Sequence, residues 1–443
     1  MMAGKKEIKL VPTEEQPYEI PENWCWVRMR NLYAINPKNS ASDDLPASFV
    51  PMERIAPGMV SDFTYEVQPW GKAKKGHTQF ADGDVAFAKI SPCFENRKSM
   101  MVNGLENGIG AGTTELIILR QPLVDQAYTF WMVSDDRFIQ GGNQTYSGTV
   151  GQQRISMDYV REYPVPLAPL AEQKRIVDTI VDLFADLDKA AENAEKIVDT
   201  YEQRRAAILA DAFAGRLTEQ WRDRNHIDIG SWQELSLSDL GILERGRSKH
   251  RPRNDERLFG GDYPFIQTGD VAGANVYVTH HTQTLSEFGM AQSRLFPAGT
   301  LCITIAANIG DVAILSYDCC FPDSVVGFTP NEKTSSKYVY YMMSVLQKEL
   351  EANAPATAQK NINLKVLNGV RISTPLREEQ DEIVRILDEL LGNEQRIKEA
   401  AEEMLDKISM IKKSILADAF RGKLGTNDPA DEPATELLRQ ILA

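Results

Sequence analysis

Two basic segments carry side chains of the types that bind nucleic acid. The stretch "ERGRSKHRPRNDER" (244–257) alternates cations with glycine, serine and proline, and "WGKAKKGH" (70–77) gathers three lysines. The candidate side chains are Lys72, Lys74, Lys75, His77, Arg245, Arg247, Lys249, Arg251 and Arg253. Lysine and arginine neutralise backbone phosphates, and arginine also pairs with guanine edges. Each segment therefore predicts a DNA-contacting loop, with a solvated loop as the alternative.

Two amide-rich stretches occupy equivalent places, 207 residues apart. They are "QQRI" (152–155) and "QKNI" (359–362). The candidates in them are Gln152, Gln153, Arg154, Gln359, Lys360 and Asn361. A carboxamide can pair bidentately with adenine. We expect base contacts from both stretches, and a structural turn is the alternative.

The sequence lacks the patterns of common catalytic sites. It has no GxxxxGK[ST] loop, no HExxH, no Asn-Pro-Pro-Tyr and no zinc-like cysteine–histidine spacing. "GIGAG" (108–112) leads into the strand-like "TELIIL", whereas a phosphate-binding loop opens a helix. The five cysteines form no CxxC pair and indicate reduced thiols. We predict no catalytic and no metal-binding residue; an enzyme with an unrecognised site is the alternative.

The elements that must position these loops are duplicated. "ILADAFAGRL" (208–217) returns as "ILADAFRGKL" (415–424), an offset of 207. "PLAEQ" (169–173) and "PLREEQ" (375–380) open the two stretches that end in these phrases. A duplication of this length predicts a pseudo-two-fold internal repeat.

Each repeat carries a long helix. Apolar residues recur every 3.5 residues from Ile176 to Ile208 and from Ile383 to Ile415, the pattern of a coiled-coil seam. Gly215 and Gly422 follow the last periodic residues, as C-terminal glycines do. One charge interrupts each seam, and an antiparallel register that pairs position x with 598 − x brings Arg204 to Glu394. The alternative is that both charges extend to solvent.

The remaining parts are globular. Strand-like runs such as "GDVAFAKI" and "TLCITIA" lie between glycine and proline turns, and "YVYYMMSVLQKELEA" (338–352) is the best helical run among them. The prediction is α+β: two mixed α/β domains joined by two long helices that form an antiparallel coiled coil. The expected segments are 1–165, 166–226, 227–374 and 375–443.

Composition limits the cellular setting. The net charge is −14, but residues 375–443 alone carry 10 basic and 16 acidic side chains, which leaves the globular parts close to neutral. Local basic patches are therefore compatible with the total. No apolar run approaches the ~18 residues of a membrane span, and the start lacks a signal-peptide core. A cytoplasmic protein is expected.

This layout resembles the specificity subunit of type I restriction–modification systems. The residues that carry the resemblance are the two helical phrases after two variable domains, with "YEIPENWCWVRMRNL" (18–32) similar to the family's usual start. The resemblance implies two target-recognition domains, each reading half of a split site in double-stranded DNA. It also implies docking of two methyltransferase subunits, which methylate adenine at N6, and of motor-nuclease subunits that cleave DNA, while this chain itself is not an enzyme. Those partners would bind S-adenosylmethionine, ATP and Mg²⁺, and this chain is expected to bind no cofactor.

A different class of protein fits the same layout. A coiled-coil scaffold with two protein-binding heads would also need duplicated helices, and the acidic total charge favours it.

Overall fold

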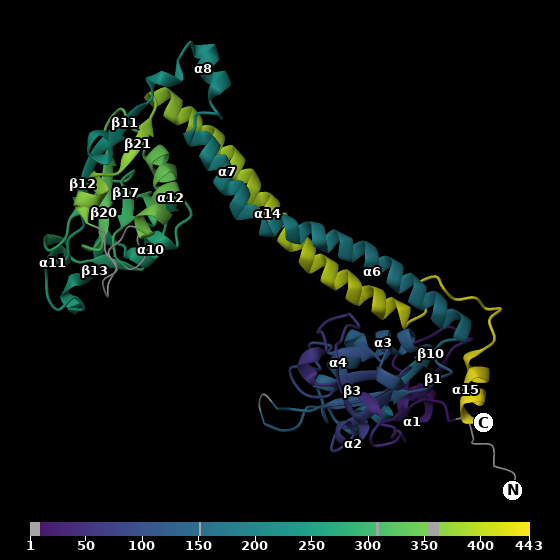
Figure 1. The fold of residues 1–443 in the computed structure, drawn as a ribbon. Helices are drawn as coiled ribbons and strands as arrows, with labels where there is room; N and C mark the ends of the chain where they lie inside the picture. The colour runs from purple at the N-terminus through teal and green to yellow at the C-terminus, as the bar shows by residue number, and fades with distance from the viewer. Residues whose placement is uncertain (1–8, 150–151, 307–309, 353–362) are drawn as a thin grey trace, which may run out of the picture. The chain divides into compact units, whose positions relative to one another are not determined.

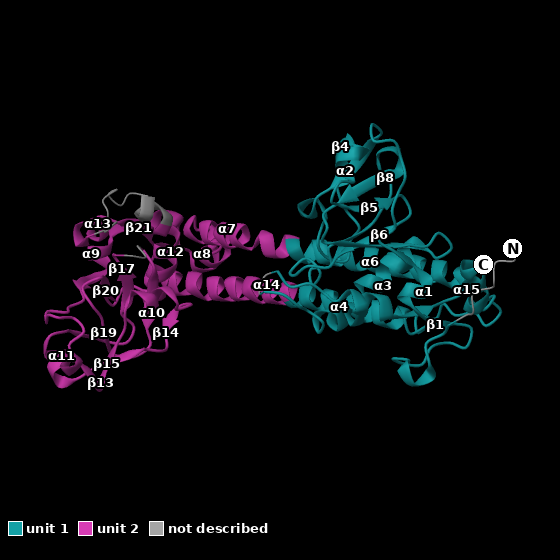
Figure 2. Ribbon diagram, turned by 90° about the horizontal axis from the view of Figure 1, so that it is seen from below, with its two compact units in different colours: residues 1–195, 403–443 teal, residues 196–402 magenta. Residues whose placement is uncertain are grey.

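The computed structural model describes residues 9–149, 152–306, 310–352 and 363–443. The chain divides into two compact units, residues 1–195 with 403–443 and residues 196–402 (Figure 2). Each unit combines one globular domain with a stretch of each long helix. The unit boundaries at 195/196 and 402/403 therefore fall inside the expected helical segments 166–226 and 375–443. Each helical segment contributes one part to each unit.

Unit 1 combines several short helices and most of the long helix α6 with three sheets. β1 pairs antiparallel with β10, and two four-stranded sheets have the orders β2-β9-β6-β7 and β4-β3-β8-β5. β3 and β8 run parallel, so the second sheet is mixed. The strands are β1 (Cys25–Arg28), β2 (Ala34–Ile35), β3 (Pro46–Val50), β4 (Glu66–Pro69), β5 (Thr78–Ala81), β6 (Val85–Ala88), β7 (Ser99–Met101), β8 (Ile109–Gly112), β9 (Leu116–Arg120) and β10 (Pro164–Leu167). The helices are α1 (Met29–Leu32), α2 (Trp70–Ala73), α3 (Gln126–Ser134), α4 (Asp136–Asn143), α5 (Met157–Glu162), α6 (Leu170–Asp199) and α15 (Ala434–Leu442).

Unit 2 has a related but distinct set of sheets. β11 pairs with β21, a five-stranded sheet has the order β12-β20-β17-β18-β14, and a four-stranded sheet has the order β15-β13-β19-β16. The strands are β11 (Gln233–Ser236), β12 (Gly241–Arg245), β13 (Phe259–Phe265), β14 (Tyr277–Val278), β15 (Gln283–Leu285), β16 (Leu295–Phe296), β17 (Leu301–Thr304), β18 (Val312–Leu315), β19 (Cys319–Cys320), β20 (Val325–Pro330) and β21 (Arg371–Thr374). The helices are α7 (Tyr201–Phe213), α8 (Glu219–Asn225), α9 (Leu237–Leu240), α10 (Thr268–Ala272), α11 (Glu287–Ala291), α12 (Ser336–Ala352), α13 (Leu364–Asn368) and α14 (Arg377–Ala419), which continues into unit 1. α12 covers the five-stranded sheet, and both units are α+β, as predicted (Figure 1).

The glycine-rich segment 108–112 serves packing. It contains strand β8 and does not open a helix. A Cβ on Gly110 would lie 2.5 Å from the Phe80 ring, and one on Gly112 would lie 2.5 Å from the Val50 carbonyl oxygen. The glycines therefore allow close approach of neighbouring strands.

The long helical segments pair antiparallel within each unit. In unit 1, Lys412 forms an ion pair with Asp188, and Phe184 shares a core with Leu416. In unit 2, Leu209 shares a core with Ile383 and Leu387. In each unit, contacts that lie further along one helix therefore involve earlier residues of the other, as in an antiparallel pair.

Arg204 and Glu394 lie against each other in unit 2. Arg204 Nε donates to Glu394 Oε2 at 2.7 Å, and Tyr201 Oη donates to Gln395 Oε1 at 2.8 Å. Arg204 Nη1 also donates to the Ile197 carbonyl at 3.1 Å, at the break between α6 and α7. One guanidinium thus neutralises a carboxylate and satisfies a carbonyl near the break.

The expected seam is wrong in one place in unit 1. The register that pairs position x with 598 − x places Leu183 opposite Ile415 of the partner helix, but Leu183 is 39% exposed, whereas Phe184 is 5% exposed. The Phe184 ring packs edge-on against Trp131 of α3, with ring centroids 5.1 Å apart. This face of α6 therefore packs against the globular domain, and the residue buried there is Phe184 rather than Leu183.

Both repeated phrases end in the same backbone turn. Gly215 and Gly422 have φ of +72° and +67°, values that glycine adopts without strain. The amide of Arg216 donates to Asp211 O and that of Lys423 donates to Asp418 O, at 3.0 and 2.9 Å. These are the bonds of a Schellman cap, and the prediction that the glycines end the helices is confirmed.

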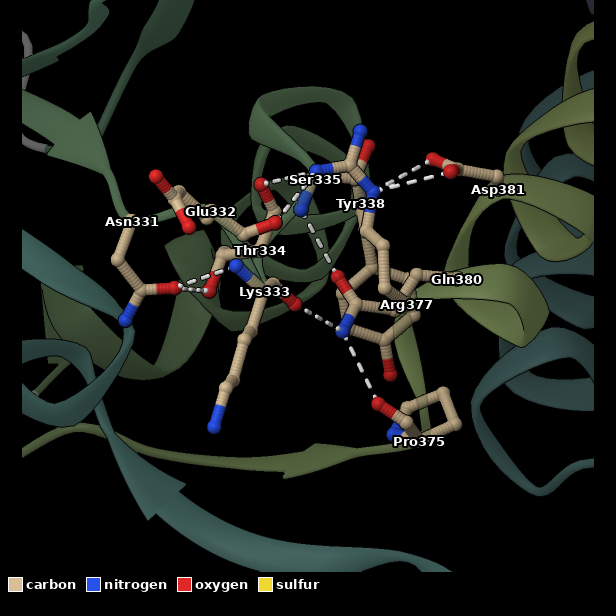
Figure 3. Close-up of polar contacts among 10 residues, drawn as sticks. All are labelled: Asn331, Glu332, Lys333, Thr334, Ser335, Tyr338, Pro375, Arg377, Gln380 and Asp381. Atoms are coloured by element: carbon tan, nitrogen blue, oxygen red, sulfur yellow. Dashed lines mark hydrogen bonds and ion pairs between the residues drawn. The ribbon is translucent and has the colours of Figure 1, made fainter.

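A buried glutamine joins α14 to the domain of unit 2. Gln380 Oε1 accepts from the Ser335 amide at 2.9 Å, and Nε2 donates to the carbonyls of Lys333 and Pro375 at 3.1 and 3.0 Å (Figure 3). Arg377 adds a bond to the Thr334 carbonyl at 3.0 Å. The start of the helix is thus fixed to the loop that leads into α12.

Its neighbour Glu379 is a buried carboxylate with several partners. Glu379 Oε1 accepts from Thr218 Oγ1 and Arg222 Nη1, each at 2.7 Å, and Oε2 accepts from Trp232 Nε1 at 3.0 Å. The side chains of Glu379 and Arg222 are 0% and 8% exposed. The carboxylate therefore joins the helix, the segment after α7 and the first residues of the domain.

Unit 1 has the same construction with other partners. Gln173 Oε1 accepts from the Asp125 amide at 2.9 Å, and Nε2 donates to the Ala168 carbonyl at 2.8 Å. Glu172 Oε2 accepts from Trp24 Nε1 at 2.7 Å and from Asn427 Nδ2 at 2.8 Å. We call the Glu–Gln pair at residues 172–173 and 379–380, with these contacts, the helix-start lock.

The Arg204–Glu394 pair gives a stability prediction. Arg204→Leu leaves a partly buried carboxylate without its cation and should lower the free energy of unfolding by about 1–3 kcal/mol in urea titrations. Replacing both residues by leucine should cost less than the single change. Arg385→Leu is the control, because Arg385 is 60% exposed and its ion pairs lie along its own helix. Equal losses for the single and double variants would contradict the coupling.

The helix-start lock gives a second stability prediction. Glu379→Leu strands the buried Arg222 and should cost about 3–5 kcal/mol, again measured in urea. Glu378, the preceding residue, is exposed, and Glu378→Leu should change stability by no more than about 0.5 kcal/mol. A similar small loss in both variants would show that the carboxylate network is dispensable.

Candidate nucleic-acid interface

An open cleft lies in the domain of unit 2. Its volume is about 530 Å³, and its lining comes from the loop after β12, from β13, β15 and α11, and from the segment just before β20. The residues that line it are Arg247, Ser248, His250, Arg253, Asn254, Leu258, Phe259, Phe265, Gln267, Gln283, Leu285, Gly289, Gln292, Ser293, Pro322 and Ser324. Aromatic and aliphatic side chains therefore lie beside amides and cations.

Two cations of the basic loop are free to meet a ligand. The amide of Arg247 donates to the Phe321 carbonyl at 3.1 Å, and that of Lys249 donates to the Gln292 carbonyl at 3.2 Å. Both residues are exposed, and neither side chain has a hydrogen-bond or ion-pair partner among the described residues. The backbone is thus held in place while the two charged side chains remain exposed and unpaired among the described residues.

The other three predicted arginines of this loop have partners within the chain. Arg245 donates to the Asp323 carbonyl, and Arg253 pairs with the Asp323 carboxylate at 2.9 Å. Arg251 Nη1 donates to the carbonyls of Ser248 and His250, at 2.7 and 2.8 Å. Their first role is to shape the loop, although Arg251 and Arg253 remain exposed.

A charged cluster fixes the end of the loop. Arg257 Nη2 and His250 Nε2 each lie 2.7 Å from Asp255 Oδ2. Hydrogen bonds, first from the Arg257 side chain and then from its backbone amide and from His250, hold the pKa of Asp255 well below its usual range. The carboxylate is therefore ionised at neutral pH and offsets part of the local positive charge.

The basic segment of unit 1 is partly engaged. Lys74 Nζ pairs with Asp43 Oδ1 at 2.6 Å, and His77 Nδ1 lies 3.0 Å from the Ala73 carbonyl. Lys72 and Lys75 are exposed and have no side-chain partner among the described residues. Two of the four predicted side chains are thus available to a ligand.

The amide-rich stretch of unit 1 is built into a turn. Arg154 donates two hydrogen bonds to the Glu115 carboxylate, from Nε to Oε2 at 2.9 Å and from Nη2 to Oε1 at 2.8 Å. The Gln153 carbonyl accepts from the Ser91 amide at 2.8 Å, and Gln152 is exposed. These contacts favour a structural role for Arg154. The equivalent candidates Gln359, Lys360 and Asn361 lie outside the described residues.

The amides of the cleft are not among the residues predicted from the sequence. Gln267, Gln283 and Gln292 come from three elements, and only the pairing of β13 with β15 brings the first two together. No spacing in the sequence marks them. The helix-start lock was seen as a repeated phrase, but its contacts were not foreseen.

The described residues contain neither a membrane-spanning helix nor a cluster of metal-ligating side chains. No helix among them is long and apolar enough to cross a membrane. No group of histidine, cysteine, aspartate and glutamate side chains among them is arranged to hold a metal ion.

The second half of the chain matches a known family. The family model described as "Type I restriction modification DNA specificity domain" matches residues 230–403, which include the cleft of unit 2. The chain is 34% identical over 265 residues to the type I restriction enzyme EcoAI specificity subunit and 35% identical over 266 residues to the EcoEI specificity subunit, both of Escherichia coli. Each alignment covers 57% of this chain and 45% of the relative, so the match spans less than half the length of these relatives.

Solved structures share the fold over most of the chain. The HsdS subunit from Thermoanaerobacter tengcongensis has a TM-score of 0.68 at 20% identity, covering 93% of this chain and 100% of that one. A chain from work described as "Structural basis underlying complex assembly and conformational transition of the type I R-M system" has a TM-score of 0.72 at 20% identity, with coverage of 92% and 100%. Residues 230–403 thus match a type I restriction–modification DNA specificity domain, and the chain is similar in sequence to specificity subunits and in fold to HsdS subunits.

Proposed function

We propose that this chain is the DNA-reading subunit of a type I restriction–modification complex. One observation carries the proposal: within the matched segment 230–403, amides and Arg247 line an open cleft, and the side chains of Arg247 and the nearby Lys249 have no partner among the described residues. Cations at a rim suit phosphates, and amides inside suit base edges. The chain recognises DNA in the cytoplasm, and the chemistry belongs to its partners.

The recognition is bipartite in this proposal. The segments 1–165 and 227–374 are two target-recognition domains, and each reads one half of a split site in double-stranded DNA. The helical segments 166–226 and 375–443 form a coiled coil that separates them and makes the molecule a pseudo-two-fold repeat. The antiparallel contacts inside each unit and the twin helix-start locks support this arrangement.

The partners are two methyltransferase subunits and the motor-nuclease subunits. S-adenosylmethionine, ATP and Mg²⁺ are bound by those partners. The helices of unit 1 offer apolar surface for docking, because Val181, Met404, Met410 and Ile411 are 45–61% exposed. Apolar side chains gathered on a helical surface commonly mark a protein interface.

The proposal is tested by mapping N6-methyladenine in host DNA by single-molecule sequencing. A split motif should be methylated in the wild type and unmethylated when the gene for this chain is deleted. Restoring the gene should restore the motif. A scaffold with two protein-binding heads, which the net charge of −14 favours, predicts an unchanged methylation pattern.

The free cations give a quantitative prediction. In a complex rebuilt with the methyltransferase subunits, Arg247→Ala and Lys249→Ala should each weaken binding to a duplex carrying the motif. Each should lower the slope of log affinity against log salt by about 0.9, because one phosphate contact is lost. Affinity titrations at several salt concentrations measure this slope.

Arg371→Ala is the matched control. Arg371 is exposed on β21, does not line the cleft, and donates to the Glu234 carbonyl at 3.1 Å. Its removal should leave the salt slope unchanged. An unchanged slope for the Arg247 and Lys249 variants as well would mean that the loop does not touch phosphate.

A further inference from the structure

A pair of glutamines lies side by side in the cleft of unit 2. Gln267 lies between β13 and α10, and Gln283 opens β15. Gln267 Nε2 donates to Gln283 Oε1 at 2.9 Å. Both residues line the cleft, as do Arg247 and Arg253.

The orientation of the first amide is fixed by the backbone around it. The Gln267 amide donates to Asp270 Oδ2 at 2.7 Å, and the Gln267 side chain accepts from the Asp270 backbone in return. This reciprocal pair is a capping box. Because Oε1 of Gln267 is occupied there, its Nε2 is the end that reaches Gln283.

The second amide is oriented in turn. Accepting from Gln267 sets the carbonyl end of Gln283, so its Nε2 is the free end and has no hydrogen-bond partner among the described residues. Oε1 retains a second lone pair. Gln283 therefore offers one donor and one acceptor side by side, held before any ligand arrives.

This pattern matches one base. In the major groove, adenine presents the N7 acceptor beside the N6 donor, and a glutamine amide pairs with both. Gln292 also lines the cleft, but no contact among the described residues orients its amide. We propose that Gln283 reads an adenine in the half-site bound by unit 2, and that Gln267 is its positioning residue. This assignment rests on the proposed function.

The test uses the complex of this chain with its methyltransferase subunits and a panel of duplexes. Each duplex replaces one A·T pair of the methylated motif by G·C. For the wild type, the replacement at the adenine that Gln283 reads should weaken binding roughly ten- to a hundredfold. In Gln283→Leu that loss should shrink to about threefold or less, while the losses at all other positions stay as in the wild type. Gln267→Leu should reduce the loss at the same position by a smaller factor.

The controls separate base reading from folding. Gln233→Leu removes an exposed glutamine of β11 that does not line the cleft, and its panel should match the wild type. Thermal unfolding of each variant is recorded. If Gln283→Leu melts at a lower temperature, the uncharged and similarly long Gln283→Met is tested in its place, since it also removes both the donor and the acceptor.

Each outcome decides the assignment. A loss of discrimination confined to one A·T pair of one half-site supports it. Unchanged discrimination at every pair overturns it, and so does a uniform weakening across the panel, which would mark a general contact. A wild-type complex that does not distinguish the motif from unrelated DNA would instead sink the proposed function.

Discussion

The buried carboxylate at the start of each long helix is the interaction on which the rest of the molecule depends. Glu379 has no exposed surface and is held by Arg222, Thr218 and Trp232. A charge buried in this way is tolerable only when it is fully paired. Its partners come from two separate segments, the one after α7 and the start of the domain, so the carboxylate ties both segments to the helix. The network thereby fixes the helix to the domain that contains the cleft.

The acidic total charge and a DNA-reading role are compatible because charge acts locally. The net charge is −14, yet the side chains of Arg247, which lines the cleft, and of the nearby Lys249 have no hydrogen-bond or ion-pair partner among the described residues. Exposed charges interact over about 8 Å at physiological salt, so carboxylates further away are largely screened. Nearby, Asp255 and Asp323 bind Arg257 and Arg253 and give the loop its shape. A ligand at the loop therefore meets the positive charge that remains after these local ion pairs have formed.

The sequence predicted what periodicity and repetition encode. The helices, their terminal glycines and the neighbourhood of Arg204 and Glu394 follow from a 3.5-residue pattern and a fixed offset. It could not predict contacts decided by the tertiary fold. Phe184, and not Leu183, is buried because Trp131 of the domain packs against it. Arg154 is bound to Glu115, which lies in a distant segment of the chain. The glutamine pair of the cleft is invisible in sequence for the same reason, since strand pairing alone unites its members.

The duplicated phrase owes its place in the chain to the helix-start lock. In unit 2, the glycine at 215 ends α7 just before Thr218 and Arg222, which complete the network of Glu379. In unit 1, the glycine at 422 ends α14 just before Asn427, which completes the network of Glu172. An antiparallel partner must end where the other helix begins, and the Schellman turn directs the following residues to that point. Each copy of the repeated sequence therefore ends one helix beside the buried glutamate that starts the other helix of the same unit. Each unit needs one copy for this reason.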